Sequence, residues 1–530
     1  MTKLTGYNLI GLEGSAQGEQ TFLAINPSTR IPLDTTFYEA TFPEIDRAIV
    51  KAEEAFLVYK SIHPEARARF LETIAEEILE LDDTLIRRCM DETALPEARL
   101  IGERMRTVNQ LRLFASVVRD GSWVDARIDT ATPDRRPFPK PDIRQMQIPL
   151  GPVGIFGASN FPLAFSVAGG DTSSAFAAGC TVVFKAHPLH PGTSELVGKA
   201  IQEAIRKTDL PDGVFSLIHG PSEKVGMTIV EHPKIAAIGF TGSFNGGKAI
   251  FDAANKRDIP IPVFAEMGSI NPVFILPGAL KERNKAIAKE LVGSFTLGVG
   301  QFCTNPGLVV TLKSSESDQF YQALKNETAE VGSGTMLSER IRMNYRKGVK
   351  KLKESKGIKV LASSNTPEKE NNVKSRVFST DADFFLRNKD LAEEVFGPST
   401  LIVAAQSKEE MINVAKNLEG HLTATIQGTE QDLAGYTDLI QILERKVGRL
   451  IFNGFPTGVE VCHSMVHGGP FPATTASQST SVGTAAIRRF SRPVCYQDFP
   501  QAALPDQLKN ENSLNIWRLV NGALTKERIG

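Results

Sequence analysis

One cysteine lies in an unusual setting. Cys303 belongs to the stretch GVGQFCTNPG, among glycines, a proline and small polar residues. Free cysteines usually pack as small hydrophobes among Leu, Val and Ile. A cysteine that acts as a nucleophile instead needs exposure, a lowered pKa and donors for the oxyanion that its attack creates. The loop by itself leaves two interpretations open: a catalytic thiol, or a structural cysteine in a tight connection.

Earlier in the chain, an amide side chain and a carboxylate each lie at the end of an apolar strand. Asn160 lies in GASNFPLAF, where its amide could donate a hydrogen bond into a cleft, although Asn-Phe-Pro is also typical of a turn or an N-cap. Glu266 lies in FAEMGSINP, where burial would raise the carboxyl pKa and suit a general base near neutral pH. A salt-bridged structural glutamate is the alternative for Glu266.

Three further motifs could serve the same site, and each is weak when taken alone. Glu394 precedes a Phe-Gly-Pro turn in AEEVFGP, where a surface acid is the ordinary interpretation. Gly242 and Ser243 follow a strand in FTGS and open a helix, a weak signal for phosphate binding. The late stretch VCHSMVHGGP contains His463 and His467.

The elements that must position these side chains alternate between strands and helices. Residues 43–120 predict helices, as in ARFLETIAEEILEL, where apolar residues recur at three- and four-residue spacing. From 151 to 268, short apolar runs alternate with helical stretches, which predicts a parallel sheet covered on both faces. A second α/β region follows, with a polar loop expected at 353–375. The cleft between two such units is the default site.

Composition excludes several classes of protein. The 530 residues carry a net charge of −1, so no overall field attracts nucleic acid or an anionic membrane. No apolar run reaches the ~18–20 residues that a membrane span needs. The five cysteines form no CxxC pair and predict neither a disulfide framework nor a metal site. We therefore expect a cytoplasmic protein with reduced thiols.

Taken together, the motifs resemble the aldehyde dehydrogenase superfamily. Asn-Phe-Pro, a strand ending in Lys, Phe-Thr-Gly-Ser, Glu-x-Gly, Gly-Gln-x-Cys and Glu-x-Phe-Gly-Pro follow one another in that order. The resemblance extends from about residue 20 to residue 500. The stretches FCTNPG, EMGSINP and SMVHGGPFPAT are similar to the bacterial subgroup that oxidises 2-oxoglutarate semialdehyde and to related fatty aldehyde dehydrogenases.

The resemblance implies a division of catalytic labour. Cys303 would attack the aldehyde carbon, and the Asn160 side chain with the Cys303 backbone N–H would form the oxyanion hole. Glu266 would then activate water to hydrolyse the thioester. His467 is the better candidate of the two late histidines for assisting the thiol, and a structural histidine is the alternative for that position.

The resemblance also implies a cofactor, NADP or NAD, although the chain contains no GxGxxG. The implied contacts to the cofactor come from Lys185, Gly242, Ser243, Glu394 and Phe396. Lys224, in HGPSEKVG, could in addition meet a 2′-phosphate, and an exposed lysine without that role is the alternative. Many NAD-preferring members of the superfamily have a glutamate three residues after the lysine, where this chain has Pro188. A carboxylate there would repel a 2′-phosphate, so its absence predicts that NADP is accepted at least as well as NAD.

The implied fold has three parts. Residues 1–128 and 149–268 would form a Rossmann-like nucleotide-binding domain, and residues 269–480 an α/β catalytic domain. Residues 129–148 and 481–505 would supply β strands that bridge subunits of a homodimer or homotetramer. The last residues, ENSLNIWRLVNGALTKERIG, could add a short amphipathic helix.

Several activities remain open at this point. The preferred substrate is 2-oxoglutarate semialdehyde, and a fatty or aromatic aldehyde is the alternative because four phenylalanines adjoin the motifs: Phe161, Phe165, Phe302 and Phe455. A coenzyme A-acylating dehydrogenase is disfavoured by Glu266, which acylating relatives usually lack. A catalytically silent relative is disfavoured because Asn160, Glu266 and Cys303 are all present.

Overall fold

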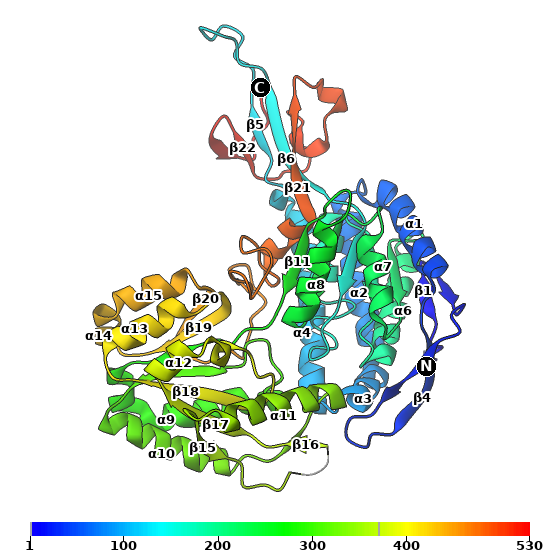
Figure 1. The fold of residues 1–530 in the computed structure, drawn as a ribbon. Helices are drawn as coiled ribbons and strands as arrows, with labels where there is room; N and C mark the ends of the chain where they lie inside the picture. The colour runs from blue at the N-terminus through cyan, green and yellow to red at the C-terminus, as the bar shows by residue number, and fades with distance from the viewer. Residues whose placement is uncertain (1–2, 369–370) are drawn as a thin grey trace.

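A computed structural model of the protein describes residues 3–368 and 371–530. Its strands form two seven-stranded sheets, one five-stranded sheet and two short hairpin-like pairs within those ranges. The two large sheets and their helices lie side by side, and the five-stranded sheet projects away from them, as Figure 1 shows. The predicted α/β class, with a small additional β unit, is confirmed.

The first large sheet has the order β11-β10-β7-β8-β9-β1-β2. The central pairs are parallel, and β1 pairs antiparallel with both β9 and β2. The strands are β1 (Asn8–Ile10), β2 (Glu13–Ser15), β7 (Val153–Phe156), β8 (Val182–Lys185), β9 (Phe215–Ile218), β10 (Ala237–Thr241) and β11 (Val263–Glu266). The five strands predicted between residues 153 and 268 are all present.

Eight helices accompany this sheet. They are α1 (Phe42–Tyr59), α2 (Pro64–Glu80), α3 (Asp82–Thr93), α4 (Glu97–Asp120), α5 (Gly170–Ala178), α6 (Pro191–Lys207), α7 (Glu223–Glu231) and α8 (Phe244–Asn255). Helix α1 begins at a capping box in which Thr41 and Glu44 bond each other's backbone N–H groups. The predicted apolar stripe of α2 is buried at Leu71, Ile74 and Ile78. The helical region expected at 43–120 is confirmed.

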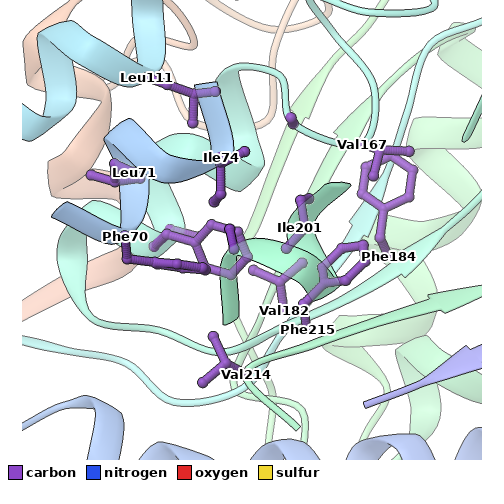
Figure 2. Packing of buried hydrophobic residues seen from close by; sticks show 14 of the residues in the cluster. Phe70, Leu71, Ile74, Leu111, Val167, Val182, Phe184, Ile201, Val214 and Phe215 are labelled. Atoms are coloured by element: carbon purple, nitrogen blue, oxygen red, sulfur yellow. The ribbon is translucent and has the colours of Figure 1, made fainter. Parts of the chain in front are cut away.

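Separate apolar cores lie on the two faces of the first sheet. On one face, α2, α4, α5 and α6 pack against β7, β8 and β9, and Figure 2 shows Phe70 and Ile74 of α2 gathered with Val182 and Phe215 from the sheet side. On the other face, residues of α1, α7 and α8 form a second core. A parallel sheet buried on both faces explains why its strands are continuous apolar runs in the sequence.

The second large sheet has the order β15-β17-β18-β13-β12-β19-β20, and all its pairs are parallel except β15 with β17. Its strands are β12 (Val273–Ile275), β13 (Leu308–Leu312), β15 (Lys359–Ser363), β17 (Arg376–Asp381), β18 (Ser399–Ala405), β19 (His421–Gln427) and β20 (Val447–Phe452). Its helices are α9 (Pro277–Thr296), α10 (Ser315–Ala329), α11 (Glu339–Glu354), α12 (Ala382–Arg387), α13 (Lys408–Asn417), α14 (Glu430–Gly435) and α15 (Thr437–Glu444).

The prediction of a surface loop at 353–375 is partly wrong. Strand β15 lies within it, at the edge of the second sheet, and β16 (Asn372–Val373) pairs with β14 (Gly334–Thr335). An edge strand that is half exposed needs few apolar residues, so its polar composition resembles that of a loop. Residues 369–370, also within the predicted loop, lie outside the described residues.

The five-stranded sheet has the order β21-β6-β5-β22-β23 and joins distant parts of the chain. Its strands are β5 (Arg127–Asp129), β6 (Ile143–Pro149), β21 (Ser491–Gln497), β22 (Arg518–Val520) and β23 (Ala523–Thr525). The short helix expected near the C-terminus is wrong, because β22 and β23 form a hairpin. Its turn, Asn521-Gly522, has positive φ at both residues, the conformation in which Asn-Gly favours a hairpin.

Near the N-terminus, β3 (Thr21–Ile25) and β4 (Pro32–Tyr38) form an antiparallel pair. Within the described ranges, none of the helices has the length and apolarity that crossing a membrane requires.

Candidate active site

Four of the predicted site residues lie along one edge of the first sheet. Lys185 and Glu266 end β8 and β11, while Asn160 and Ser243 follow β7 and β10 by a few residues. These strands are parallel neighbours, so their carboxyl ends meet at the same edge. In open α/β sheets, ligands bind outside this edge. The sheet therefore brings together side chains that are 106 residues apart in the sequence, from Asn160 to Glu266.

Cys303 follows a tight left-handed turn at the end of α9. Gly298, Val299 and Gly300 have φ values of 55°, 60° and 66° in succession. Valine is disfavoured there by about 1–2 kcal/mol, because its Cβ crowds the next carbonyl. A Cβ on Gly300 would lie 2.3 Å from the carbonyl carbon of Gly397, so only glycine fits. The turn seats the Cys303 loop against the loop that carries Glu394.

The side chains of Cys303, Glu266 and His467 converge. The Cys303 sulfur lies 3.6 Å from His467 Nε2, which in turn lies 2.8 Å from Glu266 Oε1. One potential ligand atom from each of the three residues lies within 4.8 Å of the other two. Asn160 Nδ2 donates to the carbonyl of Gln301 at 2.9 Å, two residues before the thiol. The structure thus brings together four residues selected from the sequence, with His467 and not His463 at the thiol.

The pKa of Glu266 differs from the sequence prediction. Burial alone would raise it, as expected for a carboxyl group at the end of an apolar strand. His467, Ser481 and Arg489 together outweigh that effect and hold the pKa of Glu266 below its usual value. Ser481 Oγ donates to Glu266 Oε2 at 2.5 Å. His467 Nε2 is thus within reach of both the Glu266 carboxylate and the Cys303 sulfur.

The thiol is neutral in this arrangement. Burial and the negative charge of Glu266 raise the pKa of Cys303 well above its ordinary value, while Arg106 acts in the opposite direction. A neutral thiol is a poor nucleophile. Attack by Cys303 therefore needs a nearby proton acceptor, and Glu266 and His467 are the groups in reach.

Sequence reasoning missed several residues that hold the site in place. Asn271 is fully buried, and its amide donates to the carbonyls of Cys303 and Asn305, both at 2.9 Å. Behind Glu266, the half-buried Asp171 pairs with the buried Arg489. Asn271 belongs to the EMGSINP motif, but nothing in the sequence indicates which carbonyl its amide would meet.

The residues predicted to bind a cofactor surround the same edge. Burial lowers the pKa of Lys185 to about 8, against an opposing effect of Glu39. Gly242 and Ser243 are exposed at the start of α8, where the Ser243 hydroxyl accepts from the Gly246 N–H. Lys224 is exposed in the first turn of α7, the helix that follows β9.

Glu394 and Phe396 approach this edge from the second large sheet. They lie in the loop before β18, and Phe396 is half-buried. A Cβ on Gly268 would lie 2.3 Å from Glu394 Oε2, so the carboxylate packs directly on the backbone just past Glu266. Glu394, from the second α/β unit, thus reaches the backbone next to Glu266, and its charge acts on the Cys303 thiol.

Comparison with known proteins agrees with this geometry. A model of the aldehyde dehydrogenase family matches residues 14–470. Alpha-ketoglutaric semialdehyde dehydrogenase 2 of Azospirillum brasilense is 50% identical over 521 residues, covering 98% of this chain and 99% of that protein. An alpha-ketoglutaric semialdehyde dehydrogenase of Acinetobacter baylyi is 47% identical over 527 residues, covering 99% of this chain and 100% of that protein.

Solved structures share the fold at low sequence identity. Betaine aldehyde dehydrogenase of Staphylococcus aureus, solved in complex with NAD+, has a TM-score of 0.80 at 20% identity, covering 94% of this chain and 96% of that one. Methylmalonate-semialdehyde dehydrogenase of Oceanimonas doudoroffii has a TM-score of 0.80 at 18% identity, covering 94% and 99%. With a family model spanning most of its length and two near-full-length relatives close to half identical, this chain belongs to the aldehyde dehydrogenase family.

Proposed function

We propose that this enzyme oxidises 2-oxoglutarate semialdehyde to 2-oxoglutarate with NADP or NAD as the oxidant, through a thioester on Cys303. The observation that carries the chemistry is the approach of Glu266, His467 and Asn160 to the Cys303 loop. The substrate is inferred from the near-full-length similarity to two proteins named alpha-ketoglutaric semialdehyde dehydrogenases. Both inferences support the same reaction class.

In the first step, the Cys303 sulfur bonds to the aldehyde carbon and the carbonyl electron pair moves onto oxygen. The thiol proton passes to His467, whose Nε2 lies 3.6 Å from the sulfur, and is released to solvent before the second step. The Asn160 amide has two N–H groups and uses one on Gln301, so the second can donate to the new oxyanion together with the Cys303 N–H. One such donor typically lowers the activation barrier by roughly 3–4 kcal/mol.

NADP or NAD, when bound, supplies the acceptor for the hydride that leaves the tetrahedral carbon. The residues fit such a cofactor by their chemistry: a half-buried lysine at Lys185, an exposed helix start at Gly242 and Ser243, and a carboxylate at Glu394. A helix N-terminus suits phosphate, and a carboxylate suits ribose hydroxyls. We assign Phe396 to packing beside the nicotinamide ribose.

In the second step, Glu266 takes a proton from water, which attacks the thioester carbon and releases the carboxylic acid with the free thiol. His467 and Ser481 keep Glu266 ionised, so it is available as a base over a wide pH range. A base at this position makes water the acceptor of the acyl group. We therefore prefer a hydrolytic dehydrogenase to one that transfers the acyl group to coenzyme A.

Kinetics on four aldehydes test the substrate: 2-oxoglutarate semialdehyde, succinic semialdehyde, glutaraldehyde and decanal. We expect the highest kcat/KM for 2-oxoglutarate semialdehyde, and a product that remains a free acid when coenzyme A is added. Higher kcat/KM for decanal would assign the enzyme to fatty aldehydes, which the apolar cluster of Phe161, Phe165 and Phe302 could also accommodate.

The same measurements with both nucleotides test the cofactor. We expect NADP to be used at least as well as NAD, because Pro188 offers no carboxylate to a 2′-phosphate. The charge of Glu39 acts on Lys185. Both carboxylate oxygens of Glu39 accept hydrogen bonds from Ser222, Oε1 from the Ser222 hydroxyl at 2.8 Å and Oε2 from the Ser222 backbone N–H at 3.1 Å. We assign the exposed Lys224 to a 2′-phosphate. A hundredfold preference for NAD would contradict this assignment.

Replacing His467 by asparagine should move the acid limb of the kcat–pH profile to higher pH. His467 holds the pKa of Glu266 down, and without it burial is left to raise that pKa. Glu266 is needed as a carboxylate, so activity would then be lost at a higher pH than in the native enzyme. His463→Asn is the matched control, since His463 is exposed in the same loop. An unchanged limb in His467→Asn would exclude this role.

We further propose a cytoplasmic homodimer or homotetramer. All five cysteines, in the part of the chain that the structure describes, are free thiols. The five-stranded sheet projects from the body of the subunit with β21 and β23 as its edge strands, and exposed strand edges readily pair with another chain. Cross-linking or light scattering would give the subunit number.

A further inference from the structure

Two arginines, Arg99 and Arg106, contact the aromatic cluster of Phe161, Phe165 and Phe302, and a third, Arg449, contacts Met465, which packs against that cluster. Arg99 and Arg449 are bonded to backbone carbonyls of the protein itself. Arg99 lies between the Phe161 and Phe302 rings, at 4.9 and 4.8 Å, and donates to the carbonyl of Asn160 at 2.6 Å. Arg449 donates to two backbone carbonyls of the loop that follows β20, at 2.7 and 2.8 Å. The guanidinium groups of Arg99 and Arg449 thus fix backbone segments near the cluster.

Arg106 lies two helical turns after Arg99 on α4. Its guanidinium stands over the Phe165 ring at 4.9 Å and near the Phe161 ring at 5.9 Å. Its Nε and Nη2 atoms are buried and, among the residues that the structure describes, have no hydrogen-bond partner. A buried cation with unused donors is costly, and a bidentate carboxylate is the partner that its geometry favours.

Arg106 also faces the reacting groups. The Phe165 ring, on which its guanidinium stacks, lies 5.9 Å from the His467 ring. Burial lowers the pKa of Arg106, and four groups act against that effect: Glu103 on its own helix, Cys303, Glu266 and the exposed Glu460. Glu103 is engaged elsewhere, since it accepts from the N–H groups of Leu163 and Ala164 and pairs with Arg99.

We propose that Arg106 binds the carboxylate of the aldehyde substrate, beside the Phe165 ring. This inference rests on the proposed function, because 2-oxoglutarate semialdehyde carries that carboxylate at the opposite end from its aldehyde. The aromatic rings enclose the methylene groups, and the guanidinium fixes the charged end. The arrangement selects short acidic aldehydes over neutral ones of the same length.

The test compares Arg106→Met with the native enzyme on 2-oxoglutarate semialdehyde and on pentanal, a neutral aldehyde of equal carbon number. We expect kcat/KM for the acid to fall by about 100-fold or more, mainly through KM, because a bidentate charged contact is lost. For pentanal, we expect a change within about threefold. Arg106→Lys should recover part of the loss, since it restores the charge without the planar fork.

Arg104→Met is the matched control, because Arg104 lies on the same helix and donates to the exposed carbonyl of Asp82. It should leave both substrates unaffected. Equal losses of Arg106→Met on acid and neutral aldehyde, or no loss on either, would overturn the inference. If Arg106→Met does not fold, Arg106→Gln gives the same comparison. A native enzyme that prefers decanal would refute the proposed function instead, so the two failures are distinguishable.

Discussion

Replacing Cys303 by alanine abolishes aldehyde oxidation, with an expected fall in kcat of about 10⁴-fold or more. The thiol is the group that bonds to the aldehyde carbon, and no other described cysteine belongs to the cluster with Glu266 and His467. A single-turnover experiment should show no reduced nucleotide, even at enzyme concentrations above that of the substrate. The substitution removes one sulfur atom and leaves the Cys303 carbonyl bonded to Asn271, so the loop should persist.

Cys462→Ala is the control for the Cys303 variant. Cys462 is a half-buried thiol of the loop that leads to His467, but it lies outside the cluster. Its loss should leave turnover unchanged. Equilibrium binding of NADP by both variants would confirm that each is folded. Substantial oxidation by Cys303→Ala would mean that another residue is the nucleophile.

Replacing Glu266 by glutamine should separate the two chemical steps. We expect a first-turnover burst of reduced nucleotide close to one per active site, followed by a steady-state rate lower by about 10²–10⁴-fold. The burst survives because the Glu266 charge raises the pKa of Cys303, and removing that charge favours the thiolate. Hydrolysis of the thioester slows because an amide cannot take a proton from water.

A small external nucleophile such as hydroxylamine provides the control, since it attacks a thioester without a base. It should restore much of the steady-state rate of Glu266→Gln and have little effect on the native enzyme. Loss of the burst together with steady-state turnover would place Glu266 in the first step. A normal steady-state rate would exclude the assigned role altogether.

Stability at low pH follows from the same carboxylate. The pKa of Glu266 is lower in the folded protein than in the unfolded chain. Ionised Glu266 therefore stabilises the fold fully at pH values above its unfolded pKa. This stabilisation is lost as the pH falls through its folded pKa. The acid range in which this contribution disappears therefore lies below the ordinary range of a glutamate. The contribution is retained at the near-neutral pH at which the base is used.

The sequence by itself indicated the buried strands of the two large sheets and the candidate reacting groups. Continuous apolar runs such as those that became β7, β8 and β10 can be stable only between two helical layers. Residues that follow parallel strands must then meet at one edge, which is why Asn160 and Glu266 could be chosen in advance. Cys303 stood out because its neighbours are glycines and not core residues.

The tertiary structure alone decided which charges meet. It placed His467 and not His463 at the thiol, and it reversed the expected pKa shift of Glu266 through His467, Ser481 and Arg489, each more than 200 residues away in the sequence. Among the described residues, it left Nε and Nη2 of Arg106 without a hydrogen-bond partner beside the aromatic cluster. Local patterns fix periodicity and therefore elements, but a pKa or an unpaired donor depends on contacts between elements, which no local pattern encodes.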